Sequence, residues 1–268
     1  MTTILFWNVN KKVAATALLP DLVREYGVNL VILAEEPNEG DDPSLAWAHA
    51  VGFDPVRSHV PSKLACYADA PRWEARYTND AQRLFILERL GAPALSVGAV
   101  HLPSKAFFDV HDIQAEAART AAEVRAHEQG RHDRTLLIGD FNMAPFEPGM
   151  TLARGFNAVM DARIARRGER TVQGLSYPLF YNPMWSFLGD RTIGPPGSHF
   201  HDASGHHLNH FWHMIDQVLV RPSLMEALVD VRLVDRIGDR SLADVEDGRP
   251  CASDHFPLLC TLSEGEDS

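Results

Sequence analysis

Short runs of apolar residues, each long enough for a buried strand, recur along the chain between polar segments. The first two runs cover residues 3–9 and 30–34. Between them, residues 11–26 carry apolar side chains at helical spacing, with Pro20 at a position where it can break or offset the helix. The beginning of the chain therefore predicts a β-α-β unit.

After a short helix expected at residues 42–51, the pattern changes to a meander of strands. The expected strands cover residues 54–60, 63–68, 72–78, 82–87 and 94–101. Turn-forming Pro, Gly, Asn and Asp residues separate these strands from one another. This part of the chain does not continue the alternation of strands and helices.

A long amphipathic helix is predicted at residues 109–130, because Ile113, Ala117, Ala121 and Val124 form an apolar stripe. The elements expected after it are a buried strand beginning at Leu136, a short helix at residues 147–154, an irregular stretch at 155–197, and strands at 198–203, 209–220, 229–234 and 256–262. Many strands with two or three substantial helices favour an α/β (α+β) fold in which sheets pack face to face and helices flank them.

Composition narrows the class of protein. The chain has 268 residues, 45% of them hydrophobic, and no repeat or linker divides it. We expect a single domain at residues 1–262 and an acidic tail at residues 263–268. No apolar run has the length of a membrane helix, and the N-terminus lacks the basic region of a secretory signal, so we expect a cytoplasmic protein without a membrane partner. Cys66, Cys251 and Cys260 are scattered and are expected to be structural thiols.

The formal net charge is -11, from 25 Lys and Arg residues against 36 Asp and Glu residues. An acidic surface opposes a large non-specific footprint on nucleic acid, because such binding depends on Lys and Arg displacing counterions. It leaves room for a local basic loop and for the carboxylates of a hydrolytic metal site.

Polar residues with catalytic chemistry stand where the expected strands end. They are Asn8, Glu35, His101, Asp140, Asn142, Asp216, Asp254 and His255. Each of them alone has an ordinary explanation as a cap, a turn residue or a satisfied buried side chain. Their repeated occurrence at strand ends favours a common site.

These residues supply two kinds of chemistry. Glu35 and Asp254, with Asn8 or Asp140, offer the oxygen ligands that suit Mg²⁺ or Mn²⁺. An imidazole held by a carboxylate, as His255 beside Asp216 would be, can orient or activate a water molecule, and Asp140 is the other candidate for that role. The amide and imidazole groups of Asn8, Asn142 and His101 could bind oxygens that carry charge in a phosphoryl transition state. The set predicts metal-assisted attack of water on a phosphoester.

Six motifs built around these residues resemble those of a known family. They are Phe6-Trp7-Asn8-Val9, Leu33-Ala34-Glu35, Val100-His101-Leu102, Gly139-Asp140-Phe141-Asn142, Ile215-Asp216-Gln217-Val218-Leu219 and Ser253-Asp254-His255-Phe256-Pro257. In this order they resemble the endonuclease/exonuclease/phosphatase superfamily, which includes deoxyribonuclease I and abasic-site endonucleases. The resemblance implies a deoxyribonuclease I-like four-layered sandwich of two packed mixed β-sheets flanked by helices, with a divalent metal ion at one edge.

The resemblance also implies a role for each matching residue. Asn8, Glu35 and Asp254 would hold the metal ion, Asp140 and Asn142 would orient water and phosphate, Asp216 would pair with His255, and His101 would face the phosphate or the leaving oxygen. Either Asp140 or His255 would act as the base.

The chain departs from the family pattern at three places. Ala34, rather than the usual Gln, precedes Glu35, and the following Glu36 is an alternative metal ligand. The glutamate that pairs with the central histidine in deoxyribonuclease I has no clear match here, and Glu74 and Asp80 are the candidates to pair with His101. The tyrosine motif of abasic-site endonucleases is replaced by the segment 100–104, which makes abasic-site repair less favoured.

Two segments outside the motifs are expected near the substrate. Arg166 and Arg167, with Arg163 and Arg170, concentrate positive charge that could hold a polyphosphate or a nucleic-acid backbone, or could form an ordinary solvated loop. Residues 198–213 hold six of the thirteen histidines, with aromatic residues between them.

In this histidine-rich segment, strand alternation places His199 and His201 on one face. A zinc site is one alternative for this segment, although its spacing matches no structural zinc module and it has no cysteine partner. His210 and Trp212 in this segment, and Trp185 before it, are instead expected to line the substrate path, where aromatic rings can stack on bases. Core packing is the commoner use of such rings.

The sequence therefore predicts a divalent-metal-dependent phosphoesterase with Mg²⁺ or Mn²⁺ as cofactor. A nuclease that hydrolyses phosphodiester bonds of DNA or RNA is the first hypothesis, with nucleic acid as the partner and no obligate protein partner. A phosphoesterase acting on a small phosphorylated metabolite or lipid headgroup is the alternative, which the acidic charge supports. A catalytically inactive binding module is disfavoured by the intact site.

Overall fold

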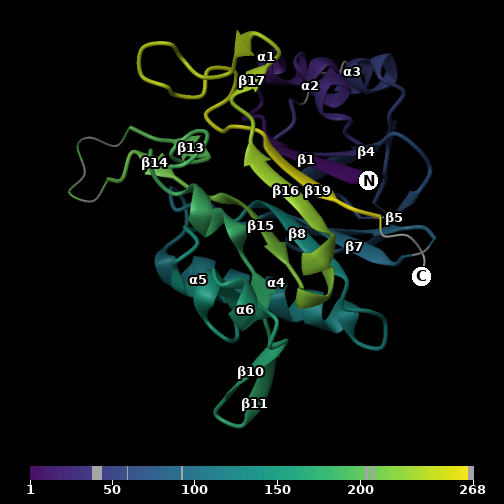
Figure 1. Cartoon of the computed structure of the whole chain (residues 1–268), viewed down its shortest axis with the longest axis vertical. Helices are drawn as coiled ribbons and strands as arrows, with labels where there is room; N and C mark the ends of the chain where they lie inside the picture. Colours follow the sequence, from purple (N-terminus) through teal and green to yellow (C-terminus); the bar gives the residue numbers. More distant parts are fainter. Residues whose placement is uncertain are drawn as a thin grey trace.

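Two large β-sheets pack against each other, and helices cover the outer face of each (Figure 1). The computed structural model describes residues 1–37, 44–58, 60–91, 93–202, 205, 207 and 209–264. Both sheets contain parallel and antiparallel neighbours. The expected α+β sandwich of two packed mixed sheets is confirmed.

The first sheet has the strand order β16-β19-β1-β2-β4-β3. β1 (Thr2–Asn8) and β2 (Leu30–Ala34) are parallel neighbours, because α1 (Val13–Thr16) and α2 (Leu19–Tyr26) carry the chain back between them. The other elements of this half are α3 (Ser44–Ala50), β3 (Asp54–Pro55), β4 (Leu64–Ala68), β16 (Leu228–Leu233) and β19 (Leu258–Leu262).

The second sheet has the strand order β5-β6-β7-β8-β15-β12-β9. β7 (Leu95–His101) and β8 (Thr135–Asp140) are parallel and joined through α4 (Val110–Glu128), while β15 (Asp216–Val220) runs antiparallel to β8. The other elements of this half are β5 (Trp73–Thr78), β6 (Leu84–Arg89), α5 (Pro148–Thr151), β9 (Ala158–Val159), α6 (Ala162–Ala165), β12 (Phe180–Tyr181), η1 (Pro183–Phe187) and η2 (Pro222–Ala227).

Three small hairpins extend from the sandwich. They are β10 (Glu169–Val172) with β11 (Leu175–Pro178), β13 (His199–Phe200) with β14 (Trp212–His213), and β17 (Arg236–Ile237) with β18 (Arg240–Ser241). The first of these projects away from the body of the molecule (Figure 1).

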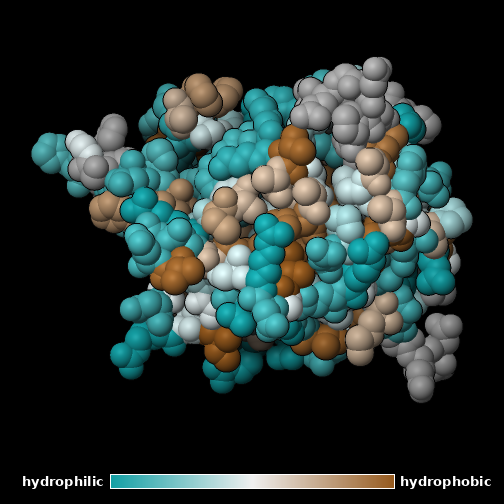
Figure 2. Space-filling view, turned by 90° about the horizontal axis from the view of Figure 1, so that it is seen from above, coloured by the Kyte–Doolittle hydropathy of each residue, from teal (hydrophilic) through white to brown (hydrophobic). Residues whose placement is uncertain are grey.

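Alternation along the central strands divides the interior into layers. On β8, Leu136 and Ile138 belong to the core shared with the first sheet, whereas Leu137 belongs to the core beneath α4. Successive side chains of a strand point to opposite faces, so a strand covered on both faces is apolar throughout. The face seen from above in Figure 2 is mostly hydrophilic, with small hydrophobic groups between the polar residues.

α4 forms as its sequence predicts. The side chain of Asp109 caps its first turn by accepting hydrogen bonds from the backbone N–H groups of His111 (2.7 Å) and Asp112 (2.9 Å). The expected apolar stripe, Ile113, Ala117, Ala121 and Val124, is buried against the second sheet. The helix can therefore carry the chain from β7 to β8 over the sheet.

Several expected boundaries are wrong. The helix expected at 11–26 is divided into two helices, which confirms the expected break near Pro20, because Pro20 has no N–H to donate and lies in the first turn of α2. Of the described residues in the strand expected at 54–60, only the two residues of β3 form a strand. The strand expected at 209–220 is divided between β14 and β15, which belong to different sheets. The stretch expected to be irregular contains β9, α6, β10, β11, β12 and η1.

Several expectations lie partly outside the described residues. The positions that are not described are residues 42–43 of the short expected helix, residue 59 of the strand expected at 54–60, residues 203–204, 206 and 208 of the histidine-rich segment, and residues 265–268 of the expected tail. Within the tail, Glu264 accepts a hydrogen bond from Thr2 Oγ1 (2.7 Å) and forms an ion pair with Arg89 (3.2 Å). These contacts hold its side chain against the domain. In the described part of the chain, no helix is both long and apolar enough to span a membrane.

We predict that Gly139→Ala will strongly destabilise the fold. A Cβ at this position would overlap the backbone carbonyl oxygen of Val100 in the neighbouring strand. We expect the free energy of unfolding to fall by about 3 kcal/mol or more, because backbone cannot yield as a side chain can. Urea denaturation monitored by far-UV circular dichroism measures this.

Gly130→Ala is the matched control for this substitution. Gly130 has a positive φ of 72°, but a Cβ there meets no other atom within 4 Å. We expect Gly130→Ala to lower the free energy of unfolding by only about 1 kcal/mol, the cost of a left-handed backbone at a residue with a Cβ. Equal unfolding midpoints for the two variants would contradict the close approach of β7 and β8 at Gly139.

Candidate active site

The topology brings the expected site residues to one edge of the sandwich. Parallel neighbours end at the same edge, so Asn8 of β1 pairs in register with Ala34 of β2, and His101 of β7 pairs with Asp140 of β8. An antiparallel neighbour begins where these strands end, and Asp216 at the start of β15 accordingly faces Asp140. The residues before β19 return to this edge for the same reason, since β19 is antiparallel to β1.

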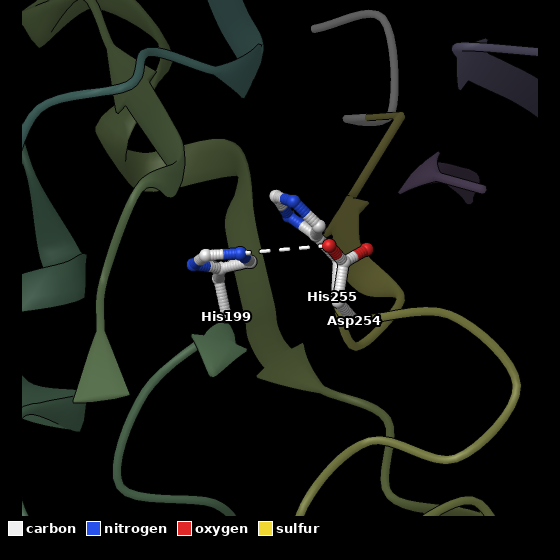
Figure 3. Close-up of side chains that lie close together, drawn as sticks. All are labelled: His199, Asp254 and His255. Carbon is white, nitrogen blue, oxygen red and sulfur yellow. Dashed lines mark ion pairs between the residues drawn. The ribbon is translucent and has the colours of Figure 1, made fainter. Parts of the chain in front are cut away.

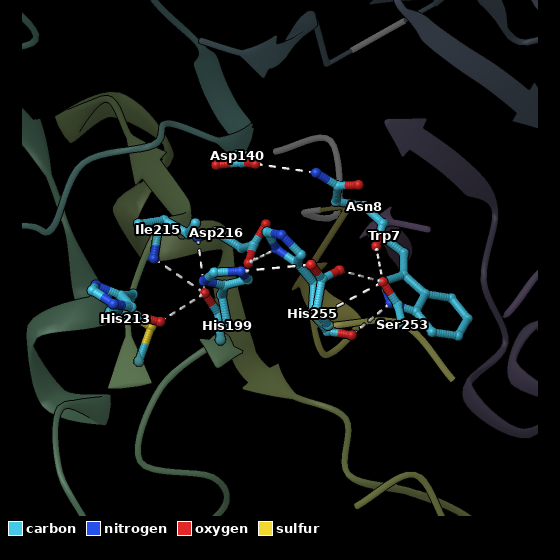
Figure 4. Close-up of polar contacts among 12 residues, drawn as sticks. Trp7, Asn8, Asp140, His199, His213, Ile215, Asp216, Ser253 and His255 are labelled. Atoms are coloured by element: carbon cyan, nitrogen blue, oxygen red, sulfur yellow. Dashed lines mark hydrogen bonds and ion pairs between the residues drawn. The ribbon is translucent and has the colours of Figure 1, made fainter. Parts of the chain in front are cut away.

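Asp216 and His255 form the central pair of the site (Figure 4). Asp216 Oδ2 lies 2.8 Å from His255 Nδ1, and both side chains are buried. Burial alone would lower the pKa of His255, but the charge and hydrogen bond of Asp216 outweigh it and raise the pKa to about 9. The expected pairing of Asp216 with His255 is present, and it leaves Nε2 as the free nitrogen of the ring.

Asp140 is held beside this pair by two amides. Its Oδ1 accepts a hydrogen bond from the backbone N–H of Asn142 (2.9 Å), and its Oδ2 accepts one from Asn8 Nδ2 (3.2 Å). Burial, followed by repulsion from Asp216, raises the pKa of Asp140 to about 7. Asp140, Asp216 and His255 each offer one ligand atom within 4.8 Å of the others.

Hydrogen bonds to neighbouring segments hold the backbones that carry His255 and Asp216 (Figure 4). Trp7 Nε1 donates to the carbonyl oxygen of His255 (2.9 Å), and Ser253 Oγ donates to the carbonyl oxygen of Asn8 (2.8 Å). Ser198 Oγ accepts from the backbone N–H of Asp216 (3.0 Å). These bonds tie both members of the central pair to neighbouring strands.

Glu35 and His101 lie on the other side of Asp140. His101 Nε2 is 3.6 Å from Glu35 Oε1 and 4.0 Å from Asp140 Oδ2. Burial lowers the pKa of His101 to about 4, so this imidazole is neutral near neutral pH. The carboxyl of Glu36 instead accepts a hydrogen bond from the Tyr67 hydroxyl (2.7 Å), so the geometry favours Glu35 over Glu36 as a metal ligand.

The expected partner of His101 is wrong. Glu74 forms an ion pair with Arg76 (3.0 Å) on its own strand, and Asp80 is exposed. Glu35 is the glutamate that lies near His101. The reason is topological: β2 ends at the same edge as β7, whereas Glu74 lies near the beginning of β5.

Glu35 and Asn142 have left-handed backbones, each with φ of 51°. Asn tolerates this conformation, but Glu rarely adopts it. Asn142 Nδ2 donates to the carbonyl oxygen of Leu102 (2.9 Å), which joins the loop after β8 to the loop after β7. Such backbone strain is typical of functional sites and directs both side chains away from ordinary strand positions.

The carboxylates of Glu35 and Asp254 and the amide of Asn8 are hard oxygen donors, which suit a divalent cation. Asn8 lies 3.5 Å from Glu35, and Ser253 connects the Asp254 loop to Asn8. Burial tends to raise the pKa of Asp254, but the hydrogen bond to His199 outweighs it, so the pKa is lowered and the group is an anion. Oxygen ligands from Asn8, Glu35 and Asp254 would leave several positions for water, as Mg²⁺ prefers.

The aromatic residues and the histidine expected to bind substrate lie in different surroundings. Trp185 packs edge-on against Phe146 of the loop after β8, with 6.1 Å between ring centroids. His210 is exposed and its ring lies 6.3 Å from that of His213. Trp212 packs against Phe256 in the core, which is the commoner use of such a ring.

The two arginines are not brought to the carboxylates. Arg166 forms an ion pair with Glu226 of η2 (2.9 Å), and η2 follows the end of β15 opposite to Asp216. Arg167 is exposed and lies on the same short segment. Substrate binding by Arg166 and Arg167 stays a prediction.

Sequence reasoning gave no individual role to three residues that shape the site, although it expected the histidine-rich segment that carries His199 to lie near the substrate. Ser198 and Ser253 hold Asp216 and the His255 segment through their hydroxyls, and His199 lies against His255. Ser253 stands inside a motif and could have been found there. Ser198 gives no signal of its own, because its role depends on the pairing of β13 with residues 254–256.

A model of the endonuclease/exonuclease/phosphatase family matches residues 5–255. The chain belongs to this family. No protein among the curated sequences matches the chain significantly. Membership of the family indicates an enzyme that hydrolyses phosphoester bonds, and members are typically dependent on a divalent metal ion.

Solved structures similar to this chain include a 3' phosphatase from Neisseria bound to a product DNA hairpin (TM-score 0.62, 17% identity, 98% of this chain and 100% of that chain). An AP endonuclease from Archaeoglobus fulgidus has a TM-score of 0.59 at 17% identity, covering 98% of this chain and 100% of that one. The catalytic domain of human Nocturnin has a TM-score of 0.59 at 15% identity, covering 98% and 94%. At these identities the likeness shows a shared fold.

We predict that Asp216→Asn will lower stability in a pH-dependent manner in the metal-free protein. The pKa of His255 is raised from 6.5 to about 9 by Asp216. A raised pKa stabilises the fold fully below the unfolded value, and the stabilisation is lost as the pH rises through the folded value. The difference in the free energy of unfolding between the wild type and Asp216→Asn should therefore be largest at pH 6 and should narrow towards pH 9.

Urea unfolding of both proteins in EDTA, at intervals from pH 6 to pH 9, measures this difference. EDTA keeps adventitious metal ions from shifting the titration. A gap that stays constant or widens over this range would contradict a charged His255 held by Asp216.

Proposed function

We propose that this protein is a divalent-metal-dependent nuclease that hydrolyses phosphodiester bonds of DNA or RNA. The observation that carries the proposal is the buried Asp216–His255 pair, 2.8 Å apart and beside Asp140, at the edge where Asn8 and Glu35 also end. An inactive binding module has no use for this charged buried pair, which is costly to maintain.

Mg²⁺ or Mn²⁺ is the proposed cofactor, held by Glu35, Asp254 and Asn8. Bound there, the ion would polarise a phosphoryl oxygen and neutralise charge on the phosphate. The chain's own groups supply proton transfer and hydrogen bonding.

Asp140 is the better candidate for the base. Its pKa of about 7 lies near the working pH, where a general base is most effective. His255, with a pKa of about 9, remains protonated at that pH and can donate a hydrogen bond from Nε2 to a phosphate oxygen. Asn142 and the neutral His101 would contact the phosphate or the leaving oxygen.

Nucleic acid is the proposed substrate class. The Neisseria structure is described as bound to a product DNA hairpin, and the Archaeoglobus protein is an AP endonuclease. In this chain, the ring of Trp185 in η1 packs against that of Phe146 in the loop after β8, and this pair of rings is proposed to stack on bases. A small phosphorylated metabolite or lipid headgroup uses the same chemistry and is a distinct outcome of the test below.

We predict metal-dependent cleavage of nucleic acid that is lost on removal of His255. Hydrolysis of single- and double-stranded DNA, RNA and bis(p-nitrophenyl) phosphate should be measured in Mg²⁺, Mn²⁺ and EDTA. His255→Ala and Asp140→Asn should each lower kcat/KM by roughly 1000-fold, the scale of lost proton transfer and hydrogen bonding at a phosphate. EDTA should abolish activity.

His111→Ala is the matched control, because His111 is an exposed histidine on α4. It should retain wild-type activity. Cleavage of the small diester alone would move the substrate to a metabolite or lipid headgroup. Full activity of both site variants, or activity in EDTA, would refute the proposed chemistry.

A further inference from the structure

The hairpin of β13 and β14 places a second imidazole against the catalytic one. β13 is joined to the His255 segment by backbone hydrogen bonds, from Phe200 N–H to the Asp254 carbonyl (3.2 Å) and from Phe256 N–H to the Ser198 carbonyl (2.8 Å). His199 and His255 form an isolated antiparallel bridge pair, and their ring centroids are 4.4 Å apart. The position of His199 is thus fixed by the backbone.

Asp254 completes a group of three side chains (Figure 3). His199 Nε2 lies 3.7 Å from Asp254 Oδ2. His199, Asp254 and His255 each offer one ligand atom, and these three atoms lie within 4.8 Å of one another. Two imidazole nitrogens and one carboxylate oxygen at such distances can bind a single ion.

We propose that His199, Asp254 and His255 form a second cation site, selective for Zn²⁺ over Mg²⁺. Two imidazoles and a carboxylate, with water in the remaining position, are a ligand set that Zn²⁺ uses in proteins. Mg²⁺ prefers oxygen ligands and does not compete well for imidazole nitrogen. This ligand set differs from the all-oxygen set of Asn8, Glu35 and Asp254, with which it shares one carboxylate.

The surroundings of His255 favour metal binding at its Nε2. Asp216 Oδ2 holds Nδ1 at 2.8 Å, which fixes the ring and leaves Nε2 free. A carboxylate bonded to the far nitrogen of a metal-binding imidazole is the usual outer partner of such a ligand. On binding, Zn²⁺ takes the place of the proton on Nε2, and that proton is released to solvent.

Occupancy of this site inhibits the enzyme. The inhibition rests on the proposed function, in which His255 Nε2 donates to the phosphate, because a nitrogen bound to Zn²⁺ has no hydrogen to donate. Zinc binding itself does not depend on that function. The two parts of the inference can therefore fail separately.

We predict that the full-length protein, held in excess Mg²⁺, binds one Zn²⁺ ion through His199. Isothermal titration calorimetry with ZnCl₂ measures affinity and stoichiometry without substrate. His199→Gln, which keeps side-chain polarity, should weaken Zn²⁺ binding by at least about 100-fold, since loss of even an outer partner costs about 10- to 100-fold. Asp216→Asn removes that outer partner and should weaken binding by about 10- to 100-fold.

His201→Ala is the control, because its ring stacks 6.2 Å from that of His199 but lies outside the three-residue group. It should bind Zn²⁺ as the wild type does. No Zn²⁺ binding to the wild type, or equal binding by the wild type and His199→Gln, would overturn the site. Circular dichroism spectra matching the wild type establish that each variant is folded.

Inhibition is measured on bis(p-nitrophenyl) phosphate in Mg²⁺, with each protein normalised to its own activity without Zn²⁺. The concentration for half inhibition should rise in His199→Gln by the same factor as the dissociation constant. Binding through His199 without inhibition would overturn the inhibitory role and keep the site. Binding through His199 by a protein that cleaves nothing in Mg²⁺ would count against the proposed function alone.

Discussion

Two buried carboxylates that face each other across β8 and β15 are the constraint on which the site depends. Asp140 and Asp216 are 2% and 0% exposed and stand opposite each other in register. Like charges in opposite positions destabilise a sheet, and a buried charge without a partner costs several kcal/mol. His255 provides the compensating cation. Trp7 of β1 donates to the backbone of His255, and Ser253 donates to the backbone of Asn8 in β1. These bonds from the first sheet hold the His255 cation in place, so the packing of the two sheets supports the charge balance in the second sheet.

The same environment gives the two imidazoles of the family motifs opposite properties. Burial dominates at His101 and lowers its pKa to about 4, whereas the Asp216 carboxylate dominates at His255 and raises its pKa to about 9. One ring is neutral and the other is a cation over the whole neutral range. A site that separates its titratable groups in this way can offer a proton acceptor and a proton donor at the same pH. Composition alone could not assign these properties, because both residues are histidines at strand ends.

The sequence predicted most of the fold and site because apolar runs mark buried strands and parallel strands end at one edge. Polar residues that follow those runs, such as Asn8, Glu35 and Asp140, can therefore be grouped from the sequence alone. The failures occur where tertiary pairing decides. Two-residue strands such as β9 and β12 carry too few side chains to show a pattern, and the long run at 209–220 divides because β14 pairs locally while β15 pairs with β8. His101 was given the wrong partner since its neighbour Glu35 comes from a strand in the other sheet.

The left-handed backbone at Glu35 brings the stability of the fold into conflict with the proposed catalytic role of a single residue. This conformation costs a residue other than Gly or Asn about 1–2 kcal/mol. Laboratory evolution that selects only for heat resistance would drift away from glutamate there, since the fold gains by its loss. A consensus or sequence-design procedure that scores backbone compatibility would make the same exchange. Given the metal-binding role proposed for Glu35, thermostable variants of the enzyme should be sought with this position held constant.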